Sequence, residues 1–366
     1  MHVCLLSTEI LGWGRAGGFG FATRALGDQL VERGHRVTVI LPQPRGTEER
    51  NIVLGGINVS AYPRLAFTEG LALLRSVDAD VFHSQEPSVG SWLARRAQPG
   101  KKHFVTCRDP RSFSDWLMEM RYPSYSAFQV LKAAVYYENF LTRAAVRKAS
   151  KVFVPAQFLG EKVKRKYGLK MVPEFLPTPI RFPDTVRKAQ RPTVCFVGRL
   201  DRRKRPESFL ELPERFPEVE FICVGDAQDP DYAAMIEERY GRIANLDLTG
   251  FIDQFADDRL SKILARSWIL VNTSVREGLP NSFIEACGHR CAILSSVDPE
   301  AFATRFGAFV PERDFATGLR TLLQDDAWRD RGEAGYAYAK ANNDAAVSVE
   351  LHLQVYENTE QGDIRR

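Results

Sequence analysis

The sequence predicts an α/β protein with two doubly wound domains, each a parallel sheet covered by helices on both faces. Short apolar runs alternate with amphipathic helical stretches along the whole chain, a pattern typical of parallel sheets. A length of 366 residues is too great for one small core and suits two domains. A proline-rich segment near the middle separates the alternation into two halves. Each half is therefore expected to form one Rossmann-like domain.

The first half opens with an apolar run, and each later run is short enough for a buried strand. Between the runs, apolar residues recur every three or four positions, as they do along one side of a helix. Strands are expected near 2–7, 36–41, 57–61, 80–83, 103–107, 151–154 and 171–176. Helices are expected near 18–33, 67–76, 88–97, 113–148 and 157–167.

The second half repeats the same rhythm and ends in two helical stretches with no strand after them. Strands are expected near 193–197, 219–224, 245–249, 268–272, 291–295 and 307–310, with helices between them. The final helices are expected near 326–341 and 345–358. Aromatic residues in this tail, such as Trp328 and Tyr356, indicate that it docks on another part of the chain.

The elements predict an N-terminal domain at 1–178, a linker at 179–191, a C-terminal domain at 192–342 and a final segment at 343–366. The prolines between 173 and 183 stiffen the connection, which is expected to belong to neither sheet. Open parallel sheets bind ligands at the carboxyl ends of their strands. A cleft between two facing domains is therefore the predicted active site.

Composition excludes several classes of function. A formal net charge of +4 is too small to indicate a nucleic-acid binder. No run approaches the roughly 18 apolar residues of a membrane span. The N-terminus lacks the basic lead and apolar core of a signal peptide. The six cysteines lie mostly within apolar runs, which favours a reducing, cytoplasmic location.

Basic residues are concentrated between positions 143 and 170, where acidic residues are nearly absent. The helical stretch at 157–167 places Phe158, Leu159 and Val163 among lysines, an arrangement that can lie in a lipid interface. The sequence therefore predicts peripheral contact with an anionic membrane, at the inner face of the membrane. The alternative is a helix that buries its apolar side on its own sheet.

Two patterns could suggest a metal, and both are interpreted as structural. Cys287, His289 and Cys291 are too closely spaced for a structural zinc site and lack a second cluster. Two Asp-x-Asp pairs fall where turns or helix starts are expected, at Asp78 and Asp80 and at Asp229 and Asp231. No essential metal is expected.

A glycine-rich loop follows the first strand. Gly12, Gly14 and Gly17 match the spacing G-x-G-x-x-G, but four residues separate the loop from the strand and no acidic residue ends the second strand. A nicotinamide-dependent enzyme is therefore not favoured. The loop still allows close backbone approach to a ligand, with Gly17, Gly18 and Phe19 as candidates, the alternative being a merely flexible loop.

Two further motifs follow strands of the second half. Gly198 ends one strand, and Arg199 and Lys204 come in the next loop, where cations can neutralise a diphosphate. The other arginines of that loop, Arg202, Arg203 and Arg205, are expected to be mostly solvated.

Glu277 lies in a loop after another strand, and Glu285 lies in the helix that follows. Gly278 and Pro280 interrupt the strand pattern, and Asn281 or Ser282 is expected to cap the helix. The alternative for these glutamates is a capped surface helix with two solvated carboxylates.

Together these motifs resemble those of the family 4 retaining glycosyltransferases, which have the GT-B fold. The resemblance rests on Gly17-Gly18, Gly198-Arg199-Leu200 with Lys204, Gly225-Asp226, Gly250-Phe251-Ile252, and Glu277-Gly278-Leu279-Pro280-Asn281 with Glu285. It covers nearly the whole chain and preserves the order and spacing of the motifs. It also implies that the last helix returns to the N-terminal domain.

The resemblance implies roles for particular residues. Glu285 would hold the ribose hydroxyls of a nucleotide-sugar, Arg199 and Lys204 its diphosphate, and Glu277 the donor sugar. Backbone groups of Gly278 and Leu279 would also bind the sugar, those around Phe251 and Ile252 the base, and Gly17 and Gly18 the phosphate or acceptor. The remaining positions expected in the site are Phe19, Gly198, Asp226, Pro280 and Asn281.

The sequence departs from the family pattern at two positions. Arg108 stands where the family often has a histidine, and arginine acts as an electrostatic partner because it cannot act as a base. His83 and His103 are nearby alternatives, each more typical of a core or surface histidine. Arg205 stands where glycine commonly follows the lysine.

The predicted function is the metal-independent transfer of a hexosyl group from a UDP- or GDP-sugar to a hydroxyl of a glycan, glycolipid or small molecule, as in polysaccharide biosynthesis. The nucleotide-sugar is a co-substrate, and no separate cofactor is expected. A nucleotide-sugar 2-epimerase of the same fold and a catalytically silent partner subunit are the alternatives. Acceptor selection is expected within 111–147, which is rich in large side chains.

Overall fold

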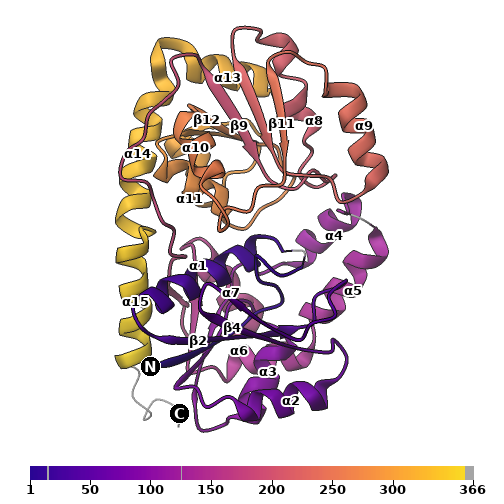
Figure 1. Ribbon diagram of the computed structural model, residues 1–366, viewed down its shortest axis with the longest axis vertical. Helices are drawn as coiled ribbons and strands as arrows, with labels where there is room; N and C mark the ends of the chain where they lie inside the picture. Colours follow the sequence, from indigo (N-terminus) through magenta and orange to yellow (C-terminus); the bar gives the residue numbers. More distant parts are fainter. Residues whose placement is uncertain (15, 125, 359–366) are drawn as a thin grey trace. The chain divides into compact units, whose positions relative to one another are not determined.

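The structure is a computed structural model that describes residues 1–14, 16–124 and 126–358. The chain forms two compact units (Figure 1). Unit 1 comprises Met1–Pro110, Lys132–Ile180 and Asn343–Arg366, of which 359–366 lie outside the described residues. Unit 2 comprises Arg111–Leu131 and Arg181–Asn342.

Unit 1 contains a sheet in the order β3-β4-β2-β1-β5-β6-β7-β8. Its strands are β1 His2–Leu6, β2 Arg36–Pro42, β3 Asn51–Leu54, β4 Ile57–Tyr62, β5 Val81–Ser84, β6 Lys102–Thr106, β7 Lys151–Val154 and β8 Glu174–Phe175. Its helices are α1 Gly18–Glu32, α2 Phe67–Ser76, α3 Val89–Ala97, α6 Phe140–Arg147, α7 Leu159–Tyr167 and α15 Ala345–Asn358, with α5 Ala127–Tyr137 shared between the units.

Successive residues of the strands of unit 1 point to opposite faces of its sheet, because side chains in a β-strand alternate with a repeat of two residues. Val3 and Leu5 belong to a core under α1 and α15, whereas Cys4 and Leu6 belong to a core under α2 and α3. On the first face, Tyr356 of α15 stacks on the ring of Phe104 at 5.9 Å. The C-terminal helix is thus part of the core of unit 1.

Unit 2 contains a parallel sheet in the order β11-β10-β9-β12-β13-β14. Its strands are β9 Thr193–Val197, β10 Glu220–Val224, β11 Leu246–Gly250, β12 Ile269–Asn272, β13 Ala292–Ser295 and β14 Gly307–Phe309. Its helices are α4 Phe113–Arg121, α8 Glu207–Leu210, α9 Pro230–Tyr240, α10 Arg259–Arg266, α11 Asn281–Gly288, α12 Phe302–Phe306, α13 Phe315–Leu323 and α14 Ala327–Asn342.

Most predicted elements are present, with one additional strand and one predicted helical stretch that is divided. β3 was not predicted; it pairs antiparallel with β4 across a tight turn in which Gly55 and Gly56 have φ of 57° and 87°. The helical stretch predicted at 113–148 is divided into α4, α5 and α6, with a new N-cap where the side chain of Asn139 accepts from the Thr142 N–H.

The strand predicted near 171–176 is present as the two-residue β8, which pairs with β7. Because these residues also lie in the proline-rich connector, the expectation that the connector belongs to neither sheet is wrong for this part of it. The predicted linker 179–191 is divided between the units, since Ile180 belongs to unit 1 and Arg181 to unit 2. The segment Arg111–Leu131, placed in the N-terminal domain by the predicted boundaries, packs in unit 2.

Candidate functional site

The candidate site of unit 2 begins where two neighbouring strands end. β9 lies between β10 and β12 and is parallel to both, so the loops after β9 and β12 leave the same edge of the sheet. The next strand in the chain, β10, lies on one side of β9, whereas β12 lies on the other side of β9. Such a reversal of strand order is a topological switch point, where doubly wound sheets bind ligands.

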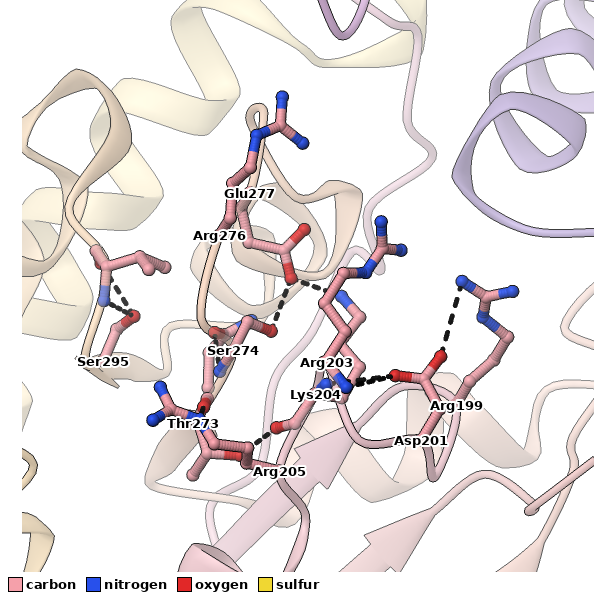
Figure 2. A network of polar contacts seen from close by, with 12 residues as sticks. Arg199, Asp201, Arg203, Lys204, Arg205, Thr273, Ser274, Arg276, Glu277 and Ser295 are labelled. Carbon is pink, nitrogen blue, oxygen red and sulfur yellow. Dashed lines mark hydrogen bonds and ion pairs between the residues drawn. The ribbon is translucent and has the colours of Figure 1, made fainter. Parts of the chain in front are cut away.

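Lys204 from the loop after β9 and Glu277 from the loop after β12 form a mostly buried ion pair (Figure 2). The hydroxyl of Ser274 donates to the same oxygen of Glu277 at 2.6 Å. Burial alone would raise the pKa of Glu277, but the charges of Lys204 and Arg203 and the two hydrogen bonds hold the pKa below its ordinary value. Glu277 is therefore an ionised carboxylate in a cationic environment.

Asp201 shapes the loop after β9. Its Oδ1 accepts from the backbone N–H groups of Arg203 at 3.1 Å and Lys204 at 3.0 Å. Its Oδ2 lies 3.6 Å from the guanidinium of Arg199 (Figure 2). One carboxylate, which is not among the predicted site residues, thus orients both predicted diphosphate-binding cations.

Arg205 adopts a backbone conformation suited to glycine. Its φ is +45°, in the left-handed region that side chains with a Cβ disfavour. Its Nε donates to the carbonyl oxygen of Thr273 at 3.2 Å, which ties it to the loop after β12. The loop keeps the geometry of the glycine that the family resemblance implies at this position.

Glycines let the backbones approach at the ends of β9, β10 and β11. A Cβ atom on Gly225 would lie 1.9 Å from the carbonyl oxygen of Gly198. The N–H of Gly225 donates to the oxygen of Gly250 at 2.9 Å, and the N–H of Leu200 donates to the oxygen of Asp226 at 2.9 Å. The loops that carry Gly198, Asp226 and Phe251 are therefore held together by backbone contacts.

Glu285 is buried in α11, with 6% of its surface exposed. Burial raises the pKa of Glu285 to about 7, and a hydrogen bond with Gln254 opposes this shift. Gln254 follows Phe251 and Ile252, of which Phe251 is exposed and Ile252 buried. The predicted ribose carboxylate therefore lies next to the loop predicted to meet the base.

The start of α11 differs from the sequence prediction. Pro280, in an extended conformation, is the N-cap, and no side chain caps the helix. Asn281 is the first helical residue, so neither Asn281 nor Ser282 has the predicted capping position. Gly278 and Leu279 are partly exposed in the loop before the helix.

A buried charge cluster, which no local sequence pattern indicates, lies beside the Lys204–Glu277 pair. Glu119 of α4 accepts from Arg276 Nη1 at 3.1 Å and from Arg203 Nη1 at 3.4 Å. It also accepts from Arg111 Nε at 2.7 Å. Arg203 is thus largely buried and paired, which corrects the expectation that it is solvated; Arg202 is exposed as expected.

A small cavity of about 40 Å³ lies between the loops after β9 and β10. Arg199 lines it, together with Gln228 and Tyr232. Ser124, which follows α4, lines it as well. Arg199 therefore faces this cavity, while Lys204 is turned toward Glu277.

The predicted glycines of unit 1 lie at the N-terminus of α1. A carboxylate oxygen of Glu9 accepts from the backbone N–H groups of Gly17 at 2.9 Å and Gly20 at 3.0 Å. An anionic group is thus already bound where the sequence analysis expected a ligand phosphate. Gly18 is exposed and Phe19 partly exposed.

Arg108 follows β6 and is buried in unit 1. Its guanidinium donates to Thr178 Oγ1 at 2.6 Å and to Gln85 Oε1 at 2.5 Å. Burial lowers the pKa of Arg108 to about 10, while the negative charge of Glu86 opposes this shift. Arg108 is therefore protonated near neutral pH and supplies charge, not base catalysis.

The two histidines that were considered as alternatives are core residues. His83 is fully buried between the hydroxyls of Tyr356 at 2.7 Å and Thr106 at 2.8 Å. His103 is buried and contacts the carbonyl oxygen of Gln98 at 2.8 Å. Burial is the main cause that lowers the pKa of both side chains.

The residues considered as metal ligands have protein partners. Asp229 accepts from the Asp231 N–H at the start of α9, and Asp80 accepts from the His2 N–H at 2.7 Å. His289 contacts Ser261 Oγ at 2.8 Å and the Glu285 carbonyl oxygen at 2.7 Å. Within the described part of the chain, no cluster of three or more such side chains could hold a metal ion.

The apolar side of α7 is buried, contrary to the sequence prediction of a lipid-facing helix. Leu159 and Val163 belong to the core of unit 1, and only Phe158 of the three predicted apolar contacts is exposed. Part of the basic stretch is also used internally, since Lys166 pairs with Glu138 and Arg147 donates to the Tyr167 carbonyl oxygen. None of the helices in the described ranges is long and apolar enough to cross a bilayer.

Two family models match successive parts of the chain. The model of Glycosyltransferase Family 4 matches residues 16–180, and the model of Glycosyl transferases group 1 matches residues 191–325. No curated protein sequence gives a significant match.

Solved structures of glycosyltransferases resemble the chain over almost its full length. Sucrose-phosphate synthase from Thermosynechococcus elongatus has a TM-score of 0.72 at 18% identity, covering 97% of this chain and 98% of that chain. HepE from Anabaena in complex with UDP and glucose has a TM-score of 0.70 at 14% identity, covering 97% and 99%. WaaG, a glycosyltransferase involved in lipopolysaccharide biosynthesis, has a TM-score of 0.67 at 16% identity, covering 97% and 100%.

The fold and the family models together define a glycosyltransferase with the GT-B fold. Both models are models of glycosyltransferases, and the Family 4 match in the first part of the chain is consistent with the family that the sequence motifs resemble.

Proposed function

We propose that the protein is a retaining, metal-independent hexosyltransferase that moves a sugar from a nucleotide diphosphate to an acceptor hydroxyl. The observation that carries the proposal is the ion pair between Lys204 and Glu277 at the carboxyl ends of β9 and β12. It is combined with Glu285, a buried carboxyl group beside the loop after β11. These groups gather at the edge of the sheet where a doubly wound domain binds its ligand.

Each charged group has a proposed task in the transfer. Lys204 and Arg199 stabilise the negative charge that develops on the departing diphosphate. Glu277, kept ionised by the cations around it, accepts hydrogen bonds from donor-sugar hydroxyls, assisted by the backbone of Gly278 and Leu279. Glu285 accepts hydrogen bonds from the ribose hydroxyls, and the loop at Phe251 and Ile252 meets the base.

The reaction replaces one bond to the anomeric carbon by another on the same face of the sugar. The bond from the anomeric carbon to the diphosphate oxygen breaks, and the electron pair stays with the diphosphate. The acceptor oxygen bonds to the anomeric carbon, and its proton passes to the departing phosphate oxygen. No side chain needs to form a covalent intermediate in this route.

Uridine is the proposed base of the donor, with guanosine as the next candidate. HepE and an α-glucosyltransferase of the same fold are solved with UDP, and HepE also with UDP-glucose. A starch synthase of the same fold binds ADP, so adenosine belongs in the test. The relation to WaaG supports a place in polysaccharide or glycolipid synthesis at the cytoplasmic side of a membrane.

The experiment that tests this proposal is a transfer and hydrolysis assay with a panel of UDP-, GDP- and ADP-sugars, with product anomers read by NMR. Retention of the anomeric configuration is expected, along with full activity in EDTA. Inversion would reject the retaining mechanism. Loss of activity in EDTA with recovery in manganese or magnesium would reject metal independence.

The same assay separates the two alternatives. Conversion of the donor to its 2-epimer without an acceptor would identify an epimerase. Donor binding without any turnover would identify a silent subunit. The paired state of Lys204 and Glu277 and the raised pKa of Glu285 speak against a silent subunit, because perturbed buried groups cluster at functional sites. Arg108 speaks against the epimerase, because arginine cannot act as a base.

A further inference from the structure

Helix α5 is apolar and yet contributes no buried residue. Phe128, Leu131 and Val135 have 63%, 52% and 67% of their surfaces exposed. Their spacing places them on one side of the helix. A soluble protein normally turns such a side toward its core, so an exposed one indicates a contact outside the chain.

Helix α4, which ends shortly before α5, has an exposed apolar side as well. Phe113, Leu117 and Met120 are 77%, 52% and 43% exposed and lie at helical spacing. The two carboxylates of α4, Asp115 and Glu119, lie on the opposite side and pair with Arg276. The helix is thus anchored by its acidic side and exposes its apolar side.

The exposed sides of these helices carry positive charge and no negative charge. The sequence from Met120 to Tyr137 has no aspartate or glutamate. Its charged residues are Arg121 and Lys132, both exposed. Apolar side chains between cations, without carboxylates, match the chemistry of an anionic lipid surface.

We propose that the exposed residues Phe113, Leu117, Met120, Phe128, Leu131 and Val135, here called the apolar face, bind the surface of an anionic lipid bilayer. A second copy of the chain is a poorer occupant, because a symmetric contact would bring the same cations together without any carboxylate between them. Helix α7 is a poorer candidate for the lipid contact, because its apolar side is buried.

The lipid contact rests on the proposed function and adds to it a place for the acceptor, at a lipid surface. A hydroxyl acceptor carried on a lipid would then be presented to the enzyme by the membrane. Binding to lipid and binding to nucleotide are separate properties of the chain. Either property can therefore fail in experiment without the other.

Sedimentation of the full chain with vesicles tests the proposal. The vesicles are pure phosphatidylcholine, or phosphatidylcholine with phosphatidylglycerol. The test variant is Val135→Asp on the apolar face, and the matched control is Val53→Asp on β3, because Val53 is also 67% exposed. For each variant, calorimetry measures the UDP affinity to verify the nucleotide site. Circular dichroism verifies the fold.

The wild type and Val53→Asp are expected to sediment with the anionic vesicles and not with the neutral ones. Val135→Asp should reduce the bound fraction roughly tenfold, since it places a carboxylate in the lipid contact. The proposal is overturned if the wild type sediments with neither vesicle, or if both variants lose binding equally. It is also overturned if the wild type forms a dimer in ultracentrifugation that Val135→Asp dissociates, because a second copy would then cover the face.

Discussion

Glu119 Oε1 accepts a hydrogen bond from Arg276 Nη1 at 3.1 Å, although 157 positions separate the two residues in the chain. Arg276 directly precedes Glu277, and the other partner Arg203 directly precedes Lys204. One carboxylate of α4 therefore holds both loops that supply the central ion pair of the candidate site. We infer that Glu119 is a positioning residue for Lys204 and Glu277.

Replacement of Glu119 by alanine should destabilise the protein and the site together. It leaves Arg203 and Arg276 buried without this carboxylate, and removing one partner of a buried ion pair costs about 3 to 5 kcal/mol. We expect a loss of this order in urea unfolding and a fall in kcat larger than the rise in KM. The milder variant Glu119→Gln keeps an acceptor oxygen and should restore part of both quantities.

Glu211→Ala is the matched control for Glu119. Glu211 also pairs with an arginine, Arg239, but both side chains are more than half exposed. An exposed pair contributes about 0.2 to 1 kcal/mol, so stability and kcat should change little. Equal effects of the two variants on kcat would show that Glu119 does not act through the site loops.

The sequence predicted the parts of the site that depend on local order. Lys204 and Glu277 each follow an apolar run, and parallel strands bring their carboxyl ends to one edge, so their proximity could be expected. The contribution of α4 could not be predicted, because 111–131 was assigned to the first domain and its contacts depend on tertiary packing. Arg203 was interpreted as solvated for the same reason, since an acidic partner so distant in sequence leaves no local signal.

For the glycine-rich loop before α1, the sequence predicted the position of the helix terminus but not the group bound there. The glycines around Gly17 indicated exposed N–H groups, and the structure shows Glu9 accepting from two of them. Glu9 is visible in the sequence, but a carboxylate nine positions before the first residue of a helix has no fixed relation to that helix. Local spacing therefore predicted the helix terminus but not its occupant.

The ion pair of Lys204 and Glu277 should make stability dependent on acid pH. The folded-state pKa of Glu277 lies below its ordinary value of 4.5, so its stabilising contribution is present above pH 4.5 and is lost as pH falls through the folded-state pKa. Lys204→Met should cost about 3 to 5 kcal/mol at pH 7, because it leaves Glu277 without its main partner.

The double variant Lys204→Met/Glu277→Gln removes both charges and should recover much of this loss. A double-mutant cycle in urea at pH 7 and pH 4 measures the coupling, which should be smaller at pH 4. Donor turnover should be lost in Lys204→Met, in Glu277→Gln and in the double variant. A coupling that does not change with pH would show that Glu277 is not the titrating partner.

Glu285 should make nucleotide affinity rise with pH near neutrality. Its pKa of about 7 in the folded protein means that the carboxyl group is partly protonated at pH 7. Because the ionised form is the better acceptor for ribose hydroxyls, UDP affinity should increase between pH 6 and pH 8. Binding should also release protons at pH 7, which calorimetry in buffers of different ionisation enthalpy detects.

Glu285→Gln separates binding from stability. The folded-state pKa is raised above 4.5, so the contribution of Glu285 to stability is present below pH 4.5 and is lost as pH rises through about 7. The ligand-free variant, compared with the wild type, should gain on the order of 2 to 3 kcal/mol between pH 5 and pH 8. Its UDP affinity should be weaker and nearly independent of pH; unchanged affinity would reject the ribose assignment.

Arg205 should respond to substitution as a residue in a glycine-type conformation. With φ of +45°, any residue with a Cβ is disfavoured there, by about 1 to 2 kcal/mol for the left-handed region. Arg205→Gly and Arg205→Ala both lose the hydrogen bond to the Thr273 carbonyl oxygen, so the difference between them reports on the backbone alone. The glycine variant should be more stable than the alanine variant by about 1 kcal/mol in urea unfolding.

At Arg202, in the same loop, the glycine and alanine variants should differ in stability with the opposite sign. Arg202 is exposed and is not among the described residues with positive φ. There, glycine should be less stable than alanine by about 0.4 to 1 kcal/mol, because it adds entropy to the unfolded chain. The stability difference between the glycine and alanine variants should therefore have opposite signs at positions 205 and 202. The same sign at both positions would mean that the backbone at Arg205 does not hold the left-handed conformation in solution.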